Sequence, residues 1–229
     1  MRAWLYKIRT PNRDTKLSVQ IAHSILILLF GIVLGVVSKW LDCMSLDDTV
    51  WWQHILKILN LGNVFSELSI WLLIALTISV YSNTPLRASL NVFLFFAGMC
   101  SSYHLYTIIF AGFNPQRYMM IWYVFTLLSS VLAFICWFCE GKTKTSLVID
   151  MLILSVMMCE CFSIGYFYFD FRDIINTLIF ICSVVILYST PKHTAISLLG
   201  AAGISFLVGA RGIFFLEAII TFVGKIVGY

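Results

Sequence analysis

Long apolar stretches alternate with short polar segments along almost the whole chain. A transmembrane helix needs about 20 mainly apolar residues, with roughly 17–25 tolerated. The predicted spans are 17–40, 68–81, 88–113, 119–138, 146–169, 174–188 and 194–210, with 213–229 as a shorter eighth candidate. Because these stretches are continuous, without the alternation typical of a barrel strand, they predict an all-α transmembrane bundle of seven or eight spans, with 1–229 as one domain.

The composition supports a membrane environment. The chain is 61% hydrophobic and 11% charged, with a mean hydropathy of +0.95. A soluble domain carries about 25% charged residues, since water must solvate its surface. We therefore expect the lipid bilayer to surround most of this chain.

The basic residues predict an orientation. With the N-terminus inside and eight spans, which place Lys225 inside, ten of the 15 Lys and Arg residues fall on the inner side. They are Arg2, Lys7, Arg9, Arg13, Lys16, Arg87, Lys142, Lys144, Lys192 and Lys225. An excess of basic residues marks the cytoplasmic side, so a plasma-membrane protein with a cytoplasmic N-terminus is expected. The positive charge is spread along the chain, and nucleic-acid binding is not expected.

Two segments outside the spans have amphipathic character. In the outer loop 41–66, Trp51, Trp52 and several aliphatic residues recur at helical spacing, which predicts a helix in the headgroup layer. A lid over an outward-facing cavity is the alternative. The basic segment 1–16 is expected to be an inner-surface anchor, or else a contact for a cytoplasmic partner.

Residues 78–90 and 185–198 resemble each other. Both end a span with Tyr-Ser, turn through Thr-Pro at Thr84-Pro85 and Thr190-Pro191, carry a basic residue and restart with small residues. This similarity predicts a tandem, parallel repeat of about four helices, with cores at 17–113 and 146–212. Convergence of two inner-face turns is the alternative.

Ionisable groups within spans are costly, so each is a candidate functional group. Glu160 lies in the middle of the predicted fifth span, and His104 lies in the third span beside Ser101 and Tyr103. We expect these four residues to line a path for a small solute. Their alternative role is to hydrogen-bond one helix to another.

Other polar and small residues favour structural roles. His23, Asp150 and Glu217 lie nearer to span ends, where a charged side chain costs less. Gly31 and Gly35 form a Gly-x-x-x-Gly pattern, which lets two helix backbones approach closely. They predict a packing face or a face for a partner subunit.

Common enzyme motifs are absent from the sequence. It contains no His-Glu-x-x-His, Gly-x-Ser-x-Gly or Walker motif. Cys136 and Cys139 form a Cys-x-x-Cys motif at a helix end without a second pair for zinc. Cys100 and His104 could share one helix face, a weak catalytic signal. No metal or cofactor is predicted.

Residues 30–42 and 81–99 carry a family resemblance. Here the chain resembles an uncharacterised family of small bacterial multi-pass membrane proteins, mainly from Gram-positive anaerobes. The resemblance implies a bacterial plasma membrane and no defined activity. In size the chain is also similar to the substrate-binding subunits of energy-coupling-factor transporters, which typically have six spans.

These observations favour a small-solute transport component, either a membrane substrate-binding subunit or a permease. Such a component could work with a partner membrane subunit or ATPase subunit. The alternatives are a non-catalytic immunity, scaffold or assembly protein, and a membrane-embedded enzyme that uses His104 with Cys100 or Glu160.

Overall fold

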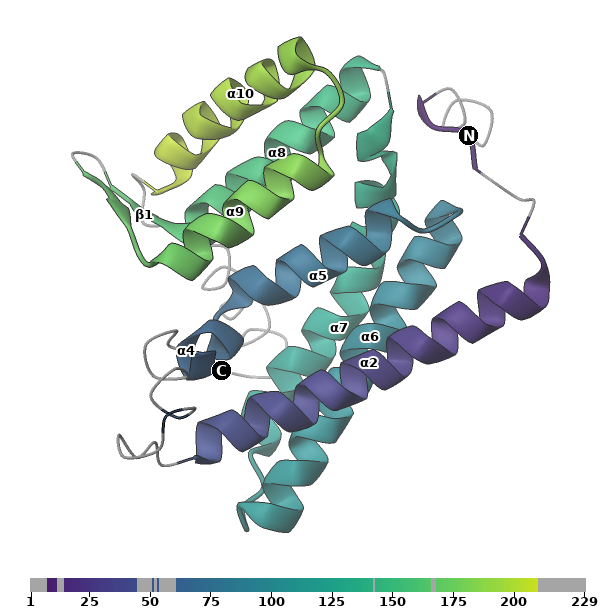
Figure 1. Ribbon diagram of the computed structural model, residues 1–229, viewed down its shortest axis with the longest axis vertical. Helices are drawn as coiled ribbons and strands as arrows, with labels where there is room; N and C mark the ends of the chain where they lie inside the picture. The colour runs from purple at the N-terminus through teal and green to yellow at the C-terminus, as the bar shows by residue number, and fades with distance from the viewer. Residues whose placement is uncertain are drawn as a thin grey trace.

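A computed structural model describes residues 8–11, 15–44, 51, 53, 61–141, 143–165 and 168–209. Its elements are α2 (Leu17–Cys43), α4 (Leu61–Ser66), α5 (Leu68–Val80), α6 (Pro85–Phe110), α7 (Gln116–Cys136), the 3-10 helix η1 (Trp137–Glu140), α8 (Lys144–Cys161), β1 (Phe162–Ile164), β2 (Phe169–Phe171), α9 (Ile174–Ile186) and α10 (Pro191–Gly209). The predicted all-α bundle is confirmed (Figure 1).

Among the described residues, three helices are long and apolar enough to cross a membrane: Leu17–Cys43, Pro85–Phe110 and Gln116–Glu140, in which η1 continues α7. The apolar helices α5 and α9 have 13 residues each, so each rises about 20 Å, less than the roughly 30 Å of a hydrocarbon core. The count of seven or eight spans stays a prediction, and the eighth candidate lies outside the described residues.

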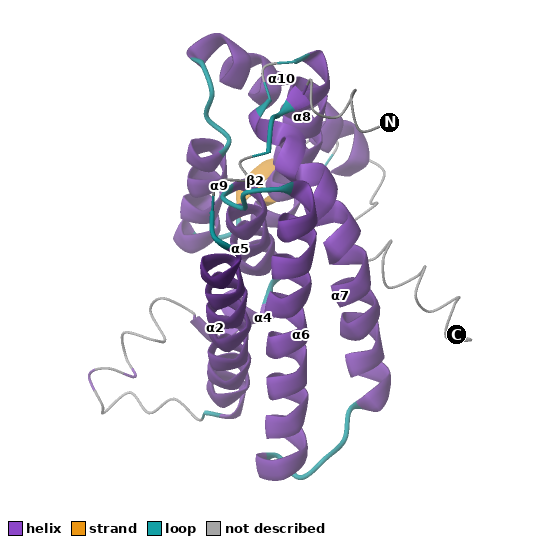
Figure 2. Cartoon of the chain, turned by 90° about the vertical axis from the view of Figure 1, so that its right-hand side faces the viewer, coloured by secondary structure: helices purple, strands orange, loops and turns teal. Residues whose placement is uncertain are grey.

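The helices form two groups that meet at α5. Helices α2, α6 and α7 make one group and α8, α9 and α10 make the other, with α5 between them in Figure 1. In Figure 2, α6 and α7 lie side by side along the long axis of the molecule. Helix α5 contacts members of both groups, and Trp71, Leu76 and Val80 on it are buried.

The first group packs tightly because glycines let α2 approach α6. Gly31 lies against the backbone of Phe95, and Gly35 lies against Met99 and Ser102. From the other side, a Cβ placed on Gly98 would lie 2.7 Å from the Leu28 carbonyl oxygen. A side chain at these positions would push the two helices apart, so the Gly-x-x-x-Gly pattern lies at an intramolecular packing face.

Aromatic rings fill the space between α5, α6 and α7. The ring centroids of Phe95 and Phe96 are 5.2 Å apart, and those of Phe96 and Phe125 are 5.4 Å apart, both with edge-to-face geometry. Trp71 extends this row from α5, with its ring 6.3 Å from that of Phe95. Aromatic pairs in this geometry add stability beyond their buried area.

In the second group, α8 packs against α10 and ends earlier than the sequence predicts. The predicted fifth span reached residue 169, but α8 ends at Cys161 and an antiparallel hairpin follows, with Phe162 opposite Phe171. Gly165 closes this hairpin, since its N–H donates to the Tyr168 carbonyl at 3.0 Å. The Phe162 ring contacts Phe169 and Phe171, and this aromatic cluster favours strand pairing over further helix.

The two Thr-Pro turns have the same local structure. The Thr84 hydroxyl accepts a hydrogen bond from the Arg87 N–H at 3.2 Å, and the Thr190 hydroxyl accepts one from the His193 N–H at 3.3 Å. Each threonine thus caps the helix that the following proline begins. The turn chemistry is shared, and the duplication itself stays a prediction.

Most of the predicted headgroup helix in 41–66 lies outside the described residues. Helix α2 continues to Cys43, beyond the predicted end of the first span, and α4 begins at Leu61.

We call one end of the bundle the amino-terminal face. It carries Thr15, the turn 81–84 and η1, since Thr15 is hydrogen-bonded to Asn83 and Trp137 to Ser82 there. The end that carries Asp42, Ser66 and Tyr103 is the opposite face.

Candidate functional site

The structure places Glu160 at the end of a helix rather than in the middle of a span. It is the residue before the last of α8 and is buried, at 9% exposure. Arg172 after the hairpin and Glu67 before α5 are the charged groups that act on it. The mid-span position expected from the sequence is wrong because α8 gives way to the hairpin two residues later. A binding role for Glu160 stays a prediction.

His104 lies near the opposite face, where it links α6 to its neighbours. Its Nδ1 is 2.8 Å from the Tyr123 hydroxyl, and its Nε2 is 2.9 Å from Oδ1 of Asn114. Both ring nitrogens therefore have partners. Ser101, three residues earlier, is exposed.

The proposed pairing of Cys100 with His104 is not formed. The Cys100 thiol lies 3.5 Å from the Thr126 hydroxyl on α7, while both nitrogens of His104 are occupied elsewhere. Among the described residues, no group of three or more His, Cys, Asp and Glu side chains could hold a metal ion. The arrangement provides no activated nucleophile at this position.

Tyr103 lines a small cavity of about 50 Å³ at the opposite face, together with Trp71, Cys100 and Trp122. Its hydroxyl donates to Oδ2 of Asp42 at 2.8 Å. Lys39 Nζ is 3.8 Å from the same oxygen. The Asp42 carboxylate is already neutralised by Lys39, and the free space suits a guest no larger than a water molecule or two.

A second and larger space lies between the two helix groups. This groove has a volume of about 270 Å³ and is lined by α5, α6, α7 and α8, for example by Leu76, Phe96, Leu132 and Val156. It lies in the half of the bundle nearer the amino-terminal face, since it follows the last turns of α5 and α7, the first half of α6 and the middle of α8. Sequence analysis did not predict it, because its walls come from helices far apart in the chain.

The groove is deep on one side and open on the other. Phe96 forms part of its floor and is fully buried. Ile135 of α7 and Leu152 of α8 also line it, and their side chains are 46% and 52% exposed. Since apolar side chains are exposed on both flanking helices, the opening faces the same surroundings as the rest of the lipid-facing surface.

The polar atoms in the groove are already used. The hydroxyl of Ser79 donates to the Ala75 carbonyl at 2.7 Å, and that of Ser129 donates to the Thr126 carbonyl at 2.8 Å. Both bonds close within a single helix. The groove therefore offers contact with apolar atoms and no acid, base or charge for chemistry.

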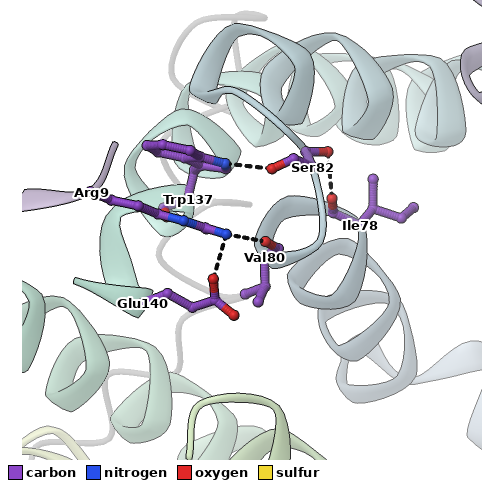
Figure 3. Close-up of polar contacts among 6 residues, drawn as sticks. All are labelled: Arg9, Ile78, Val80, Ser82, Trp137 and Glu140. Atoms are coloured by element: carbon purple, nitrogen blue, oxygen red, sulfur yellow. Dashed lines mark hydrogen bonds and ion pairs between the residues drawn. The ribbon is translucent and has the colours of Figure 1, made fainter. Parts of the chain in front are cut away.

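Arg9 joins three parts of the chain at the amino-terminal face (Figure 3). Its guanidinium donates to the carbonyls of Trp137 at 2.8 Å and Val80 at 3.0 Å, and it forms an ion pair with Glu140. The Trp137 ring lies 4.3 Å from the guanidinium carbon, and the indole N–H donates to the Ser82 carbonyl at 2.6 Å.

The role of the basic segment 1–16 as an inner-surface anchor or partner contact stays a prediction, since residues 1–7 and 12–14 lie outside the described chain. Arg9 itself is bound within the protein. Partial burial lowers the pKa of Arg9, and the Glu140 carboxylate opposes that change. An arginine remains charged near neutral pH even so, and Arg9 closes the end of the bundle beneath the groove.

The sequence was also compared with known proteins. No protein-family model, curated protein or solved structure matches the chain. The resemblance to small bacterial multi-pass proteins stays a prediction, and the site must be judged on its own geometry.

Proposed function

We propose that this membrane protein binds the acyl chain of an anionic phospholipid in the groove between α5, α7 and α8. The groove itself carries the proposal, because its lining is mainly apolar and it opens sideways between two helices. A chain entering from the bilayer would exchange one apolar environment for another and would gain close packing against the groove walls.

The charge at the amino-terminal face supports an anionic headgroup. Lys16, Arg87, Lys144 and Lys192 lie at this end of the bundle, where Glu140 is paired with Arg9. Each basic residue near an anionic membrane surface contributes about 1 kcal/mol. By the same distribution this face is the cytoplasmic one.

The opposite face has a different charge. Asp42, Glu67, Asp170 and Asp173 gather there, and the basic residues described at that end are Lys39, Arg117 and Arg172. An anionic headgroup is less favoured beside these carboxylates. The groove is therefore best placed for lipids of the leaflet at the amino-terminal face.

Photo-crosslinking tests this function. The full-length protein is placed in nanodiscs with a phosphatidylglycerol whose acyl chain carries a diazirine, and labelled peptides are located by mass spectrometry. We expect labels on the groove-lining segments of α7 and α8. Leu132→Trp, which fills the groove, should lower this labelling several-fold, and Val156→Phe on the facing wall should do the same.

Leu127→Trp is the matched control, since Leu127 lies on the same helix, is 62% exposed and is not part of the groove. It should leave groove labelling unchanged. Equal labelling of the Leu132→Trp and Leu127→Trp proteins would refute the proposal and favour the scaffold alternative.

A small-solute transport component is the second candidate, and the Tyr103–Asp42 cavity supports it. Tyr103 is the predicted solute-binding residue that lines a cavity at the opposite face. The volume of about 50 Å³ and the paired Asp42 carboxylate make this site less suited to a ligand than the groove. Solute binding that Tyr103→Phe removes and Leu132→Trp preserves would reverse this ranking.

A further inference from the structure

Asp150 is more deeply buried than its position in the sequence suggests. It lies in the second turn of α8 and is only 2% exposed, against 9% for Glu160. Its Oδ2 is 3.5 Å from Nδ1 of His193, which lies in the first turn of α10 and has a side chain 18% exposed. The pair thus connects the two helices that pack most closely in the second group.

Four polar atoms in this place have no hydrogen-bond partner among the described residues. They are Oδ1 of Asp150, Nδ1 and Nε2 of His193, and Oγ1 of the neighbouring Thr194. Buried polar atoms are nearly always bonded, and an exception in a native protein reflects strain, a redox or catalytic role, or a bound water or ion. The backbone of His193 is held in place, since its N–H donates to the Thr190 hydroxyl.

Two uncharged thiols lie near Asp150. Cys136 of α7 and Cys139 of η1 are close enough to act on its carboxylate, and a thiol is neutral near neutral pH. Cys139 belongs to an apolar cluster that also contains Leu187 after α9 and Val80 of α5.

The charged residues of this face lie farther out. Lys144 and Lys192 are exposed, and Arg9 is paired with Glu140 next to Cys139. His193 is therefore the basic group closest to the carboxylate within the described chain. The net charge of the buried site depends on how many protons Asp150 and His193 share.

We propose that Asp150 and His193 form a buried proton-binding site that holds one shared proton and couples protonation to the packing of α10 against α8. With one proton the pair has no net charge, either as an ion pair or as two neutral groups. Removing that proton leaves a lone carboxylate in the apolar contact, and adding a second leaves a lone imidazolium. Both states are costly in a buried place.

The stability of the protein should then depend on pH in a defined direction. Above about pH 6.5, the ordinary pKa of histidine, the unfolded chain releases the proton that the folded pair keeps. The folded state then binds more protons than the unfolded state, so stability falls as pH rises. The ratio of folded to unfolded protein should fall by up to about tenfold per pH unit for this single proton.

The test uses the full-length protein in detergent, with the midpoint of thermal unfolding measured between about pH 5 and 8. The double variant D150N/H193Q keeps the shape of the pair without its titration and should lose most of the pH dependence. His23→Gln removes an exposed histidine of α2 and should retain the wild-type profile. A double variant with the wild-type profile would overturn the proposal.

Infrared spectroscopy keeps the proposal testable if the double variant does not fold. In His193→Gln the proton should reside on Asp150, so near neutral pH the spectrum should contain the carbonyl stretch of a buried carboxylic acid. The stretch should be absent from Asp150→Asn. Identical spectra for the two variants would show that no proton is held at this site.

Discussion

The two helix groups differ in how the polar side chains between their helices are hydrogen-bonded. In the first group, polar side chains between α2 and α6 are paired: the Ser24 hydroxyl donates to Oδ1 of Asn91 at 2.7 Å, and that of Ser102 to the Ile32 carbonyl at 3.0 Å. In the second group, α8 and α10 meet at Asp150 and His193, where Asp150 Oδ1 and both ring nitrogens of His193 have no hydrogen bond to any described residue. Between α2 and α6 the polar groups are paired, whereas between α8 and α10 buried polar atoms have no partner among the described residues.

Helix length separates the groups as well. Helices α2 and α6 have 27 and 26 residues, whereas α8 has 18 and α9 has 13. The shorter second group leaves α7 and α8 in little contact, and the apolar groove lies between them. The groove therefore lies between the two groups, where helices of different length leave space, rather than inside either group.

The largest expected effect tests the close packing of the first group. Gly35→Ala should destabilise the protein by about 1–3 kcal/mol, because the new Cβ would meet the Met99 backbone and the Ser102 side chain. The unfolding midpoint of purified protein in detergent measures it.

Gly203 of α10 provides the matched control in the second group. Within the described part of the chain, nothing lies within 4 Å of a Cβ placed there. Gly203→Ala should therefore stabilise the protein by up to about 1 kcal/mol through helix propensity alone. If the two substitutions had the same sign, the comparison between the groups would fail.

A smaller effect is expected at the contact that joins α5 to η1. Arg9→Gln removes two hydrogen bonds to backbone carbonyls and the ion pair with Glu140. The loss should be about 2 kcal/mol, since two carbonyls at the end of the core lose a charged donor. Lys16→Gln, at an exposed position, should change stability by less than about 0.5 kcal/mol. Equal losses would mean that Arg9 is not a structural contact.

The smallest effect compares the two Thr-Pro turns. Thr84→Ala and Thr190→Ala should each cost about 1 kcal/mol, because each removes the hydroxyl that caps the next helix. Thermal unfolding of both variants side by side measures the difference. If the two losses of unfolding free energy differed by more than about 1 kcal/mol, the turns would be alike in sequence only.

Local chemistry explains what could be predicted from the sequence. Continuous apolar stretches predict helices because hydrocarbon cannot satisfy an open backbone, and the all-α bundle follows from them. The Thr-Pro turns predict that a new helix starts soon after residues 85 and 191, because proline ends or restarts a helix. The caps that Thr84 and Thr190 provide are seen only in the structure. Gly31 and Gly35 predict a close helix contact, although only the structure shows that the partner is α6 of the same chain.

Tertiary packing decided the rest. The end of α8 depends on phenylalanines that meet across a hairpin. Glu160 therefore lies at a helix end, whereas the sequence predicted the middle of a span. The groove needs four helices from distant parts of the chain, and no local pattern encodes the space between them. Asp150, near a span end in the sequence, is buried because α10 folds over it. How deeply a side chain is buried depends on the residues that pack around it, and the sequence alone does not show which residues these are.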